Sequence, residues 1–121
     1  MALSEKDLLA KVPTGLYIGG KWVAGHGAGQ IAVEDPATGQ TLLEIANANA
    51  DDGLAALASA YETQATWAKV PPRERGEILR RTFELVRERS EEFATLISLE
   101  MGKPIAEARG EVAYGNEFLR W

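Results

Sequence analysis

The sequence predicts a short β region of hairpins followed by three or so amphipathic helices. Apolar side chains alternate with polar ones in the first third of the chain and then recur at a spacing close to 3.6 residues. Glycine and proline residues separate the segments. With 121 residues, 45% of them hydrophobic and 26% charged, the composition is that of a globular chain of at most one small domain.

The β region follows a polar leader, residues 1–15, which we expect to be flexible. A first hairpin is predicted for residues 16–23, because Gly19 and Gly20 can supply the positive φ angles of a tight turn. The segment 25–29 lacks large apolar side chains, so we expect a mobile surface loop there. The front of the chain is therefore predicted to be one hairpin flanked by irregular segments.

The second hairpin and the first helix follow in order. Alternation at 31–33 and again at 41–45, around the proline-and-glycine turn 35–39, predicts a second pair of strands. From Asn49 the apolar period becomes helical. Asn49 is the expected N-cap, because its carboxamide can accept a hydrogen bond from the amide of Asp52.

Proline and glycine delimit the remaining helices. One helix is expected to end near Pro71, and a long apolar stripe after it predicts a second helix with a bend or break near Ser90. Gly102 suits a left-handed helix cap, and a third helix is predicted to begin near Pro104. The chain ends within that helix at Trp121, which leads us to expect a truncated piece of a longer protein.

Charge and composition exclude several classes of function. Between Arg73 and Glu92 six arginines face six glutamates, with expected pairs such as Glu77 and Arg81, so this helix is read as solvated and not as a nucleic-acid surface. The net charge of −5 also disfavours nucleic acid as a partner. No apolar run is long enough for a membrane span and the N-terminus is charged, so we expect no membrane partner and a cytoplasmic protein.

The sequence matches neither a dinucleotide-binding fingerprint nor a serine triad. Gly25, Gly27 and Gly29 alternate and precede a strand, which does not match the dinucleotide-binding fingerprint. His26 is the only histidine and has no carboxylate next to it in the sequence, so a solvated surface residue is expected and not a member of a serine triad. Without cysteine, thiolate metal sites are excluded.

Four motifs in order carry a family resemblance. They are Tyr17-Ile18-Gly19-Gly20-Lys21-Trp22-Val23, Asp35-Pro36-Ala37-Thr38-Gly39, Pro72-Arg73-Glu74-Arg75 and Leu99-Glu100-Met101-Gly102-Lys103-Pro104. Residues 16–121 as a whole resemble the N-terminal portion of the cofactor-binding domain in the NAD(P)-dependent aldehyde dehydrogenase superfamily, an α/β fold in the parent enzyme. Residues 106–121 are most similar to bacterial succinate-semialdehyde dehydrogenases.

The resemblance implies what the parent enzyme does. It implies a homo-oligomer that uses NAD or NADP to oxidise an aldehyde, here succinate semialdehyde to succinate, or another aldehyde of the superfamily. A cysteine thiolate forms a thiohemiacetal, hydride passes to nicotinamide, and water activated by a glutamate releases the acid. In the family the nucleophile, the general-base glutamate and the nucleotide-binding strands all follow this segment, so the resemblance implies no catalytic or cofactor-binding residue here and no good binding of NAD or NADP. The chain has no cysteine, so we expect an inactive fragment.

The resemblance also implies two minor sites. The side chain of Glu100 matches a position that helps to hold a monovalent cation, with a backbone carbonyl near Glu34 as the second ligand. An ordinary carboxylate at a helix end is the alternative. Tyr114 matches a position that lines the substrate channel, and packing in the core is the alternative for it.

The helices beginning near Asn49, Pro72 and Pro104 are expected to bury their apolar faces against a parallel sheet that this chain does not contain. The isolated chain should therefore be marginally stable. A different class of function remains open, in which the chain is a stand-alone hairpin-plus-helix interaction module that docks on a partner through its Trp121 end.

Overall fold

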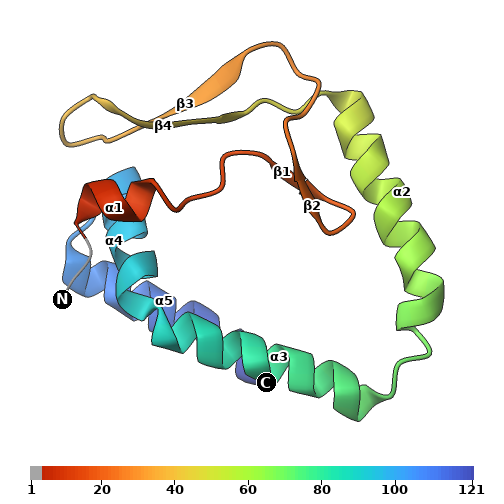
Figure 1. Ribbon diagram of the computed structural model, residues 1–121. Helices are drawn as coiled ribbons and strands as arrows, with labels where there is room; N and C mark the ends of the chain where they lie inside the picture. Colours follow the sequence, from red (N-terminus) through yellow and green to blue (C-terminus); the bar gives the residue numbers. More distant parts are fainter. Residues whose placement is uncertain (1–3) are drawn as a thin grey trace.

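A computed structural model describes residues 4–121 and shows an open frame of helices and hairpins. In chain order the elements are α1 (Glu5–Leu9), β1 (Leu16–Ile18), β2 (Lys21–Val23), β3 (Gln30–Glu34), β4 (Thr41–Ala46), α2 (Ala50–Trp67), α3 (Pro72–Glu88), α4 (Ser90–Met101) and α5 (Ile105–Arg120). Helix α2 forms one side of the frame and α3 its base, while α1, α4 and α5 meet at the opposite corner (Figure 1). The predicted order of hairpins and helices is confirmed.

Both predicted hairpins are present, as two separate antiparallel sheets of two strands. In the first, Tyr17 lies opposite Trp22, and their ring centroids are 5.0 Å apart. Gly19 and Gly20 have φ angles of 60° and 77°, as the tight turn requires. In the second hairpin β3 pairs with β4, and an irregularity in register follows Val33.

The structure describes a short helix, α1, within the stretch 1–15 that is predicted to be a flexible leader. The hydroxyl of Ser4 accepts a hydrogen bond from the amide of Asp7 and caps α1, and Leu8 is buried. This short helix packs near α4 (Figure 1). A helix of five residues is too short to show a helical period, so the sequence pattern could not reveal it.

The first long helix begins as the sequence predicted. The Asn49 carboxamide oxygen accepts from the amide of Asp52 at 3.0 Å, and the Asp52 carboxylate accepts from the amide of Asn49 at 3.0 Å. This reciprocal capping box satisfies two backbone donors at the helix end. Helix α2 ends at Trp67, four residues before Pro71.

The predicted break near Ser90 is confirmed. Arg89 leaves the helical region with φ −106° and ψ 19°, and it separates α3 from α4. Helix α4 ends at Gly102, whose φ of 69° is the expected left-handed cap. A side chain at this position would also meet Pro36, whose Cγ lies 2.9 Å from the place of a Cβ. Glycine is therefore required there for both backbone and packing reasons.

The small core lies where α3, α4 and α5 meet. Ala94, Ala108 and Val112 are buried, with Val86 and Ile97 packed against them. Alanine on both α4 and α5 lets the two helix backbones approach closely. A bidentate ion pair between Arg109 and Glu91, at 2.9 and 2.8 Å, joins the same two helices at their exposed side.

The rest of the chain buries little. Its accessible surface is 9052 Å², whereas a compact monomer of 13.1 kDa is expected to expose only about 6400 Å². No large side chain among the described residues is fully buried. The open frame therefore holds its secondary structure with a much smaller core than a self-sufficient domain of this length.

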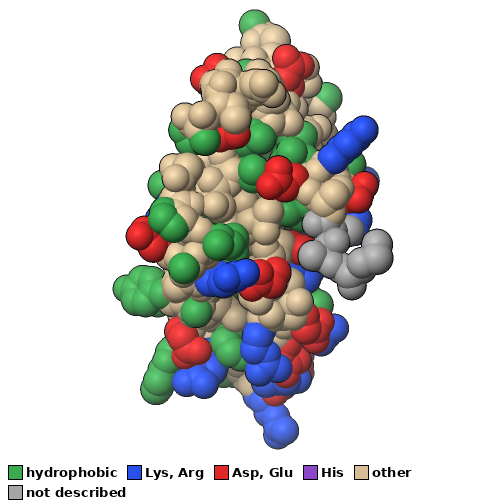
Figure 2. Space-filling model, turned by 90° about the vertical axis from the view of Figure 1, so that its left-hand side faces the viewer, with side chains coloured by type: hydrophobic (Ala, Val, Ile, Leu, Met, Phe, Trp, Pro, Cys, Tyr) green, Lys and Arg blue, Asp and Glu red, His purple; other side chains and the backbone are tan. Residues whose placement is uncertain are grey.

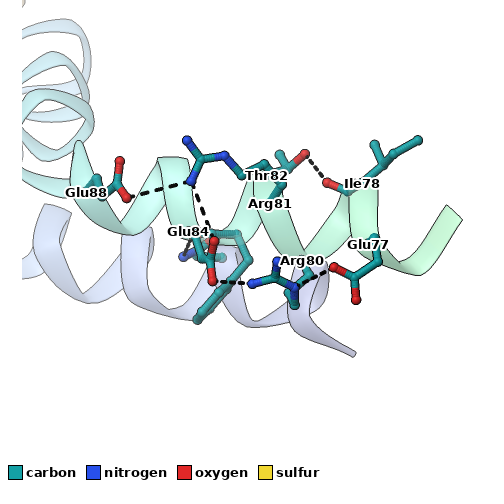
Figure 3. Close-up of polar contacts among 9 residues, drawn as sticks. Glu77, Ile78, Arg80, Arg81, Thr82, Glu84 and Glu88 are labelled. Atoms are coloured by element: carbon teal, nitrogen blue, oxygen red, sulfur yellow. Dashed lines mark hydrogen bonds and ion pairs between the residues drawn. The ribbon is translucent and has the colours of Figure 1, made fainter. Parts of the chain in front are cut away.

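The outer face of α3 is the solvated ionic surface that the sequence predicted, with different pairs. Arg80 bonds to Glu77 at 2.9 Å and also to Glu84, while Arg81 lies 4.0 Å from Glu88 (Figure 3). The expected pair of Glu77 with Arg81 is replaced by Glu77 with Arg80. Exposed pairs of this kind add little stability.

Candidate functional site

Large apolar side chains are exposed on each of the helices α2 to α5. The exposed large residues on α2, α3, α4 and α5 are Leu54, Leu57, Tyr61, Trp67, Ile78, Leu79, Leu85, Phe93, Met101, Ile105, Tyr114 and Phe118. Figure 2 shows hydrophobic side chains reaching the surface between charged groups on one such side of the molecule. Exposed apolar surface on this scale marks an interaction surface.

One concave part of this surface lies between the first hairpin and α2. Tyr17, Leu57, Tyr61 and Trp67 line it, with Gly19 and Gly20 of the hairpin turn at its edge. The lining is mostly apolar, with the hydroxyls of its tyrosines, Ser59 and Thr63, and it includes no carboxylate, amine, imidazole or thiol. This groove can therefore accept apolar side chains of a partner.

A second groove lies at the corner where α2 gives way to α3. It is lined by Trp67, Pro72, Arg75, Gly76, Ile78 and Leu79. The Nε of Arg75 is buried and has no hydrogen-bond acceptor among the described residues. The Oδ1 of Asn116 on α5 is likewise buried without a donor, although its Nδ2 donates to the carbonyl of Phe83 at 3.0 Å. Such orphaned atoms are rare in complete proteins.

His26 and Asp52 form a polar anchor at the start of α2. The carboxylate of Asp52 accepts from the amide of His26 at 2.8 Å, and its second oxygen lies 2.6 Å from the imidazole Nδ1. Asp52 is only 3% exposed, whereas the histidine ring faces solvent. The amide of Gly27 also donates to the carbonyl of Asn47 at 3.0 Å. The expected mobile loop is therefore tied to α2 by several hydrogen bonds.

The same contacts shift both ionisation equilibria. Hydrogen bonds from the amides of Asn49 and His26, and then from the imidazole, lower the pKa of Asp52 to about 2. The bond to Asp52, helped by its negative charge, raises the pKa of His26 above its usual value. The carboxylate that His26 lacks in the sequence is thus supplied from 26 residues away. Its ring bonds to no hydroxyl among the described residues, so the pair acts as an anchor.

The structure shows where Glu34 and Glu100 lie, the two positions of the predicted cation site. Glu34 ends β3 and Glu100 lies in the last turn of α4, both exposed. The contact of Pro36 with Gly102 brings these two segments together. No three acidic, histidine or cysteine side chains cluster within residues 4–121. The cation site at Glu34 and Glu100 stays a prediction.

Tyr114 lies on the uncovered face of α5. It is 71% exposed, and its ring meets Phe118 edge-on at a centroid distance of 5.3 Å. Within the described residues, Tyr114 is therefore not packed in a core. Its assignment to a substrate channel stays a prediction.

The glycine loop 25–29 does not have the form of a dinucleotide-binding loop. The glycine loop 25–29 donates its His26 and Gly27 amides within the chain, so these amides are not free to hold phosphate. The loop leads into strand β3 and not into a helix.

Across the described part of the chain, no helix is both long and apolar enough to cross a membrane.

Comparison with known proteins gives a consistent result. The aldehyde dehydrogenase family model matches residues 22–121. A succinate-semialdehyde dehydrogenase of Paenarthrobacter nicotinovorans is 61% identical over 80 residues, which are 66% of this chain and 18% of that protein. The crystal structure of succinate-semialdehyde dehydrogenase from Burkholderia pseudomallei is 40% identical, with a TM-score of 0.83 over 87% of this chain and 22% of that one.

The relatives also show the class of cofactor. An E. coli NADP-dependent enzyme is 35% identical, with a TM-score of 0.87 over 89% of this chain and 22% of that one. PnpE, solved in complex with nicotinamide adenine dinucleotide, is 34% identical, with a TM-score of 0.86 over 90% of this chain and 23% of that one. The relatives are thus NAD(P)-dependent oxidoreductases.

The arrangement of hairpins and helices matches part of the aldehyde dehydrogenase fold. The chain belongs to the aldehyde dehydrogenase family. It spans about a fifth of the length of the relatives that it matches.

Proposed function

We propose that this chain is the N-terminal segment of an NAD(P)-dependent enzyme that oxidises succinate semialdehyde to succinate through a cysteine thiohemiacetal. The observation that carries the proposal is the 61% identity to a succinate-semialdehyde dehydrogenase over 80 residues. The matched relatives are about five times longer, which leaves room for the nucleophile and the cofactor site outside these residues. The sequence contains no cysteine, so the segment alone is expected to be inactive.

The proposed role of the segment is structural. Its helices would cover a sheet formed by the remainder of the enzyme. The surface of 9052 Å², well above the roughly 6400 Å² expected for a compact chain of this mass, supports a missing partner of considerable area. The uncovered stripe on α3, with Ile78, Leu79 and Leu85, supports the same role.

Three residues are proposed to contribute locally in the complete enzyme. Glu100 and a backbone carbonyl near Glu34 would hold a monovalent cation, which would fix the end of α4 against β3. Tyr114, exposed on α5, would line the path of the aldehyde. No residue of the segment is proposed to act on the reacting carbon.

The test compares the 121-residue chain with the protein expressed from the gene continued beyond the Trp121 codon. Reduction of NAD and NADP is followed by absorbance with succinate semialdehyde and with a panel of other aldehydes. We expect turnover from the longer protein, fastest with succinate semialdehyde, and none from the 121-residue chain. Turnover by the pure short chain, or a gene without a cysteine-bearing continuation, would overturn the proposal.

The alternative of a stand-alone interaction module makes opposite predictions for the short chain. A sharp thermal transition independent of concentration, with dispersed NMR shifts, would favour the module. A segment that lacks its partner is expected to bind a hydrophobic dye and to associate, because its apolar surface is exposed. Dye fluorescence and sedimentation at several concentrations distinguish the two.

A further inference from the structure

The groove at the corner between α2 and α3 combines an apolar lining with one cationic group. Trp67, Ile78 and Leu79 are exposed around it, and Arg75 forms part of its wall. In Figure 1 the corner lies at the end of the base helix away from the α4–α5 contact. The groove therefore lies away from the small core, and among the described residues its lining comes from the end of α2 and the start of α3.

Arg75 differs from Arg80, Arg81 and Arg87 of the same helix. Arg80 bonds to Glu77 and Glu84, and Arg81 lies near Glu84 and Glu88, so both are satisfied on their own helix (Figure 3). Arg87 lies over the ring of Phe83.

Arg75 is only half-exposed and makes no side-chain hydrogen bond or ion pair within residues 4–121, and its Nε is buried. A buried donor on a charged group without an acceptor is unfavourable, and native proteins supply the acceptor.

We propose that this groove docks a later segment of the same polypeptide, C-terminal to residue 121, which brings a carboxylate to Arg75. The inference rests on the proposed function. A guanidinium binds a carboxylate through two parallel hydrogen bonds, which would satisfy the Nε as well as one terminal nitrogen. The apolar side chains of that segment would cover Trp67 and Ile78.

Two observations favour a segment of the same chain as the occupant. The matched relatives are about five times longer than this chain, so most of the polypeptide lies outside it. Leu85, seven residues after Ile78 and therefore on the same face of α3, is also exposed, and this is the face that the remainder of the enzyme is proposed to cover. A second copy of the chain, or an unrelated protein, would be a different outcome of the test.

The first experiment measures thermal unfolding of the full-length enzyme with single substitutions. Arg75→Leu should lower the melting temperature by about 5 °C or more, because it leaves a buried carboxylate unpaired. Arg73→Leu is the matched control, since Arg73 is exposed on the same helix; it should change the value by about 1 °C or less. Arg75→Lys should fall between them, because lysine keeps the charge and loses the fork.

In the 121-residue chain Arg75→Leu should not lower the thermal transition, because the acceptor is absent there. Equal destabilisation in both proteins, or a neutral substitution in the full-length enzyme, would overturn the docking site. Activity of the unsubstituted enzyme is a separate readout. An active enzyme with a neutral Arg75→Leu contradicts the docking site alone, whereas an inactive enzyme that Arg75→Leu still destabilises contradicts the proposed function alone.

A second experiment identifies the occupant directly. A photo-cross-linking phenylalanine derivative replaces Ile78 in the full-length enzyme, and the linked peptides are identified by mass spectrometry. The expected product is a link within one polypeptide to a peptide that follows residue 121 and contains aspartate or glutamate. A link between two subunits, to a foreign protein, or to a peptide without an acidic residue would contradict the proposal.

Discussion

The corner of α3, α4 and α5 is packed, whereas α2 stands almost free along its length. Ala94 and Ala108 are fully buried where α4 meets α5. On α2, Leu57 and Tyr61 are exposed, and the main tertiary neighbour is the small β1–β2 hairpin. The difference shows that one part of the segment carries its own core, while the other depends on contacts that the described residues do not supply.

The free helix is nevertheless fixed at one end. The carboxylate of Asp52 accepts hydrogen bonds from the amides of Asn49 and His26. These polar contacts position the first turn of α2, which lacks apolar packing. A helix anchored at its start and uncovered along its side is suited to receive a partner, because its direction is set before the partner binds.

The largest expected effect tests whether the exposed stripe on α3 is a core face in the complete enzyme. Leu85 is 41% exposed in this chain. In the full-length enzyme Leu85→Ala should cost about 2–5 kcal/mol of unfolding free energy as a core truncation. In the 121-residue chain the cost should be far smaller. Denaturant titration of both proteins measures the difference, and equal costs would argue against a missing covering sheet.

A second pair of substitutions compares the packed corner with the free helix inside the short chain. Ala94→Leu should cost about 1–3 kcal/mol, because the added methyl groups have no space between α4 and α5. Leu57→Ala on α2 should change stability by less than about 0.5 kcal/mol, because the side chain is 64% exposed. Urea titration followed by circular dichroism provides the values. A cost at Leu57 as large as that at Ala94 would show that α2 is packed in solution.

The third prediction concerns the polar anchor of the free helix. Asn49→Ala removes one half of the capping box and should cost about 1 kcal/mol of helix stability. Asn49→Asp is the matched control, because it keeps the accepting oxygen. Helicity of the short chain against temperature measures both. If alanine and aspartate behaved alike at this position, the cap would not hold the start of α2.

The smallest effect is a pH dependence of the same anchor. The pKa of Asp52 is lowered from 3.8 to about 2, so its contribution is present above pH 3.8 and is lost as the pH falls towards 2. The pKa of His26 is raised above 6.5, so its contribution is complete below pH 6.5 and is lost as the pH rises through the folded value. The anchor should therefore be strongest between pH 3.8 and 6.5.

The only histidine of the chain makes this dependence simple to measure. One imidazole resonance should titrate above pH 6.5 in proton NMR. His26→Gln should flatten the loss of stability at higher pH and leave the acid limb in place. Asp52→Asn should remove both limbs. A histidine that titrates at or below 6.5 in the folded chain would contradict the ion pair.

Local features of the fold could be predicted from the sequence because neighbouring residues decide them. Each of these features involves residues that are only a few positions apart: the turn at Gly19 and Gly20, the cap at Asn49, and the left-handed Gly102. The family could be predicted for a related reason, since its motifs are short and occur in a fixed order. The small helix α1 could not be predicted, because five residues are too few to show a helical period.

The candidate site was harder to predict, because its contacts join distant parts of the chain. The partner of His26 lies 26 residues away, and that of Arg109 lies 18 residues away. The orphaned nitrogen of Arg75 is visible only when every neighbour has been placed. Tyr114 lies off the spacing that buries Ala108, Val112 and Asn116 on α5, and the structure shows that its face is uncovered.

By itself, the sequence determined the order of strands and helices, their caps and breaks, and the family to which the chain belongs. These depend on backbone conformation and hydrogen bonding within a few residues, which side chains encode directly. Only the tertiary structure decided which apolar faces are covered, which loop is anchored, and which guanidinium lacks a partner. Burial and pairing depend on side chains that are far apart in the sequence and become neighbours only when the helices pack.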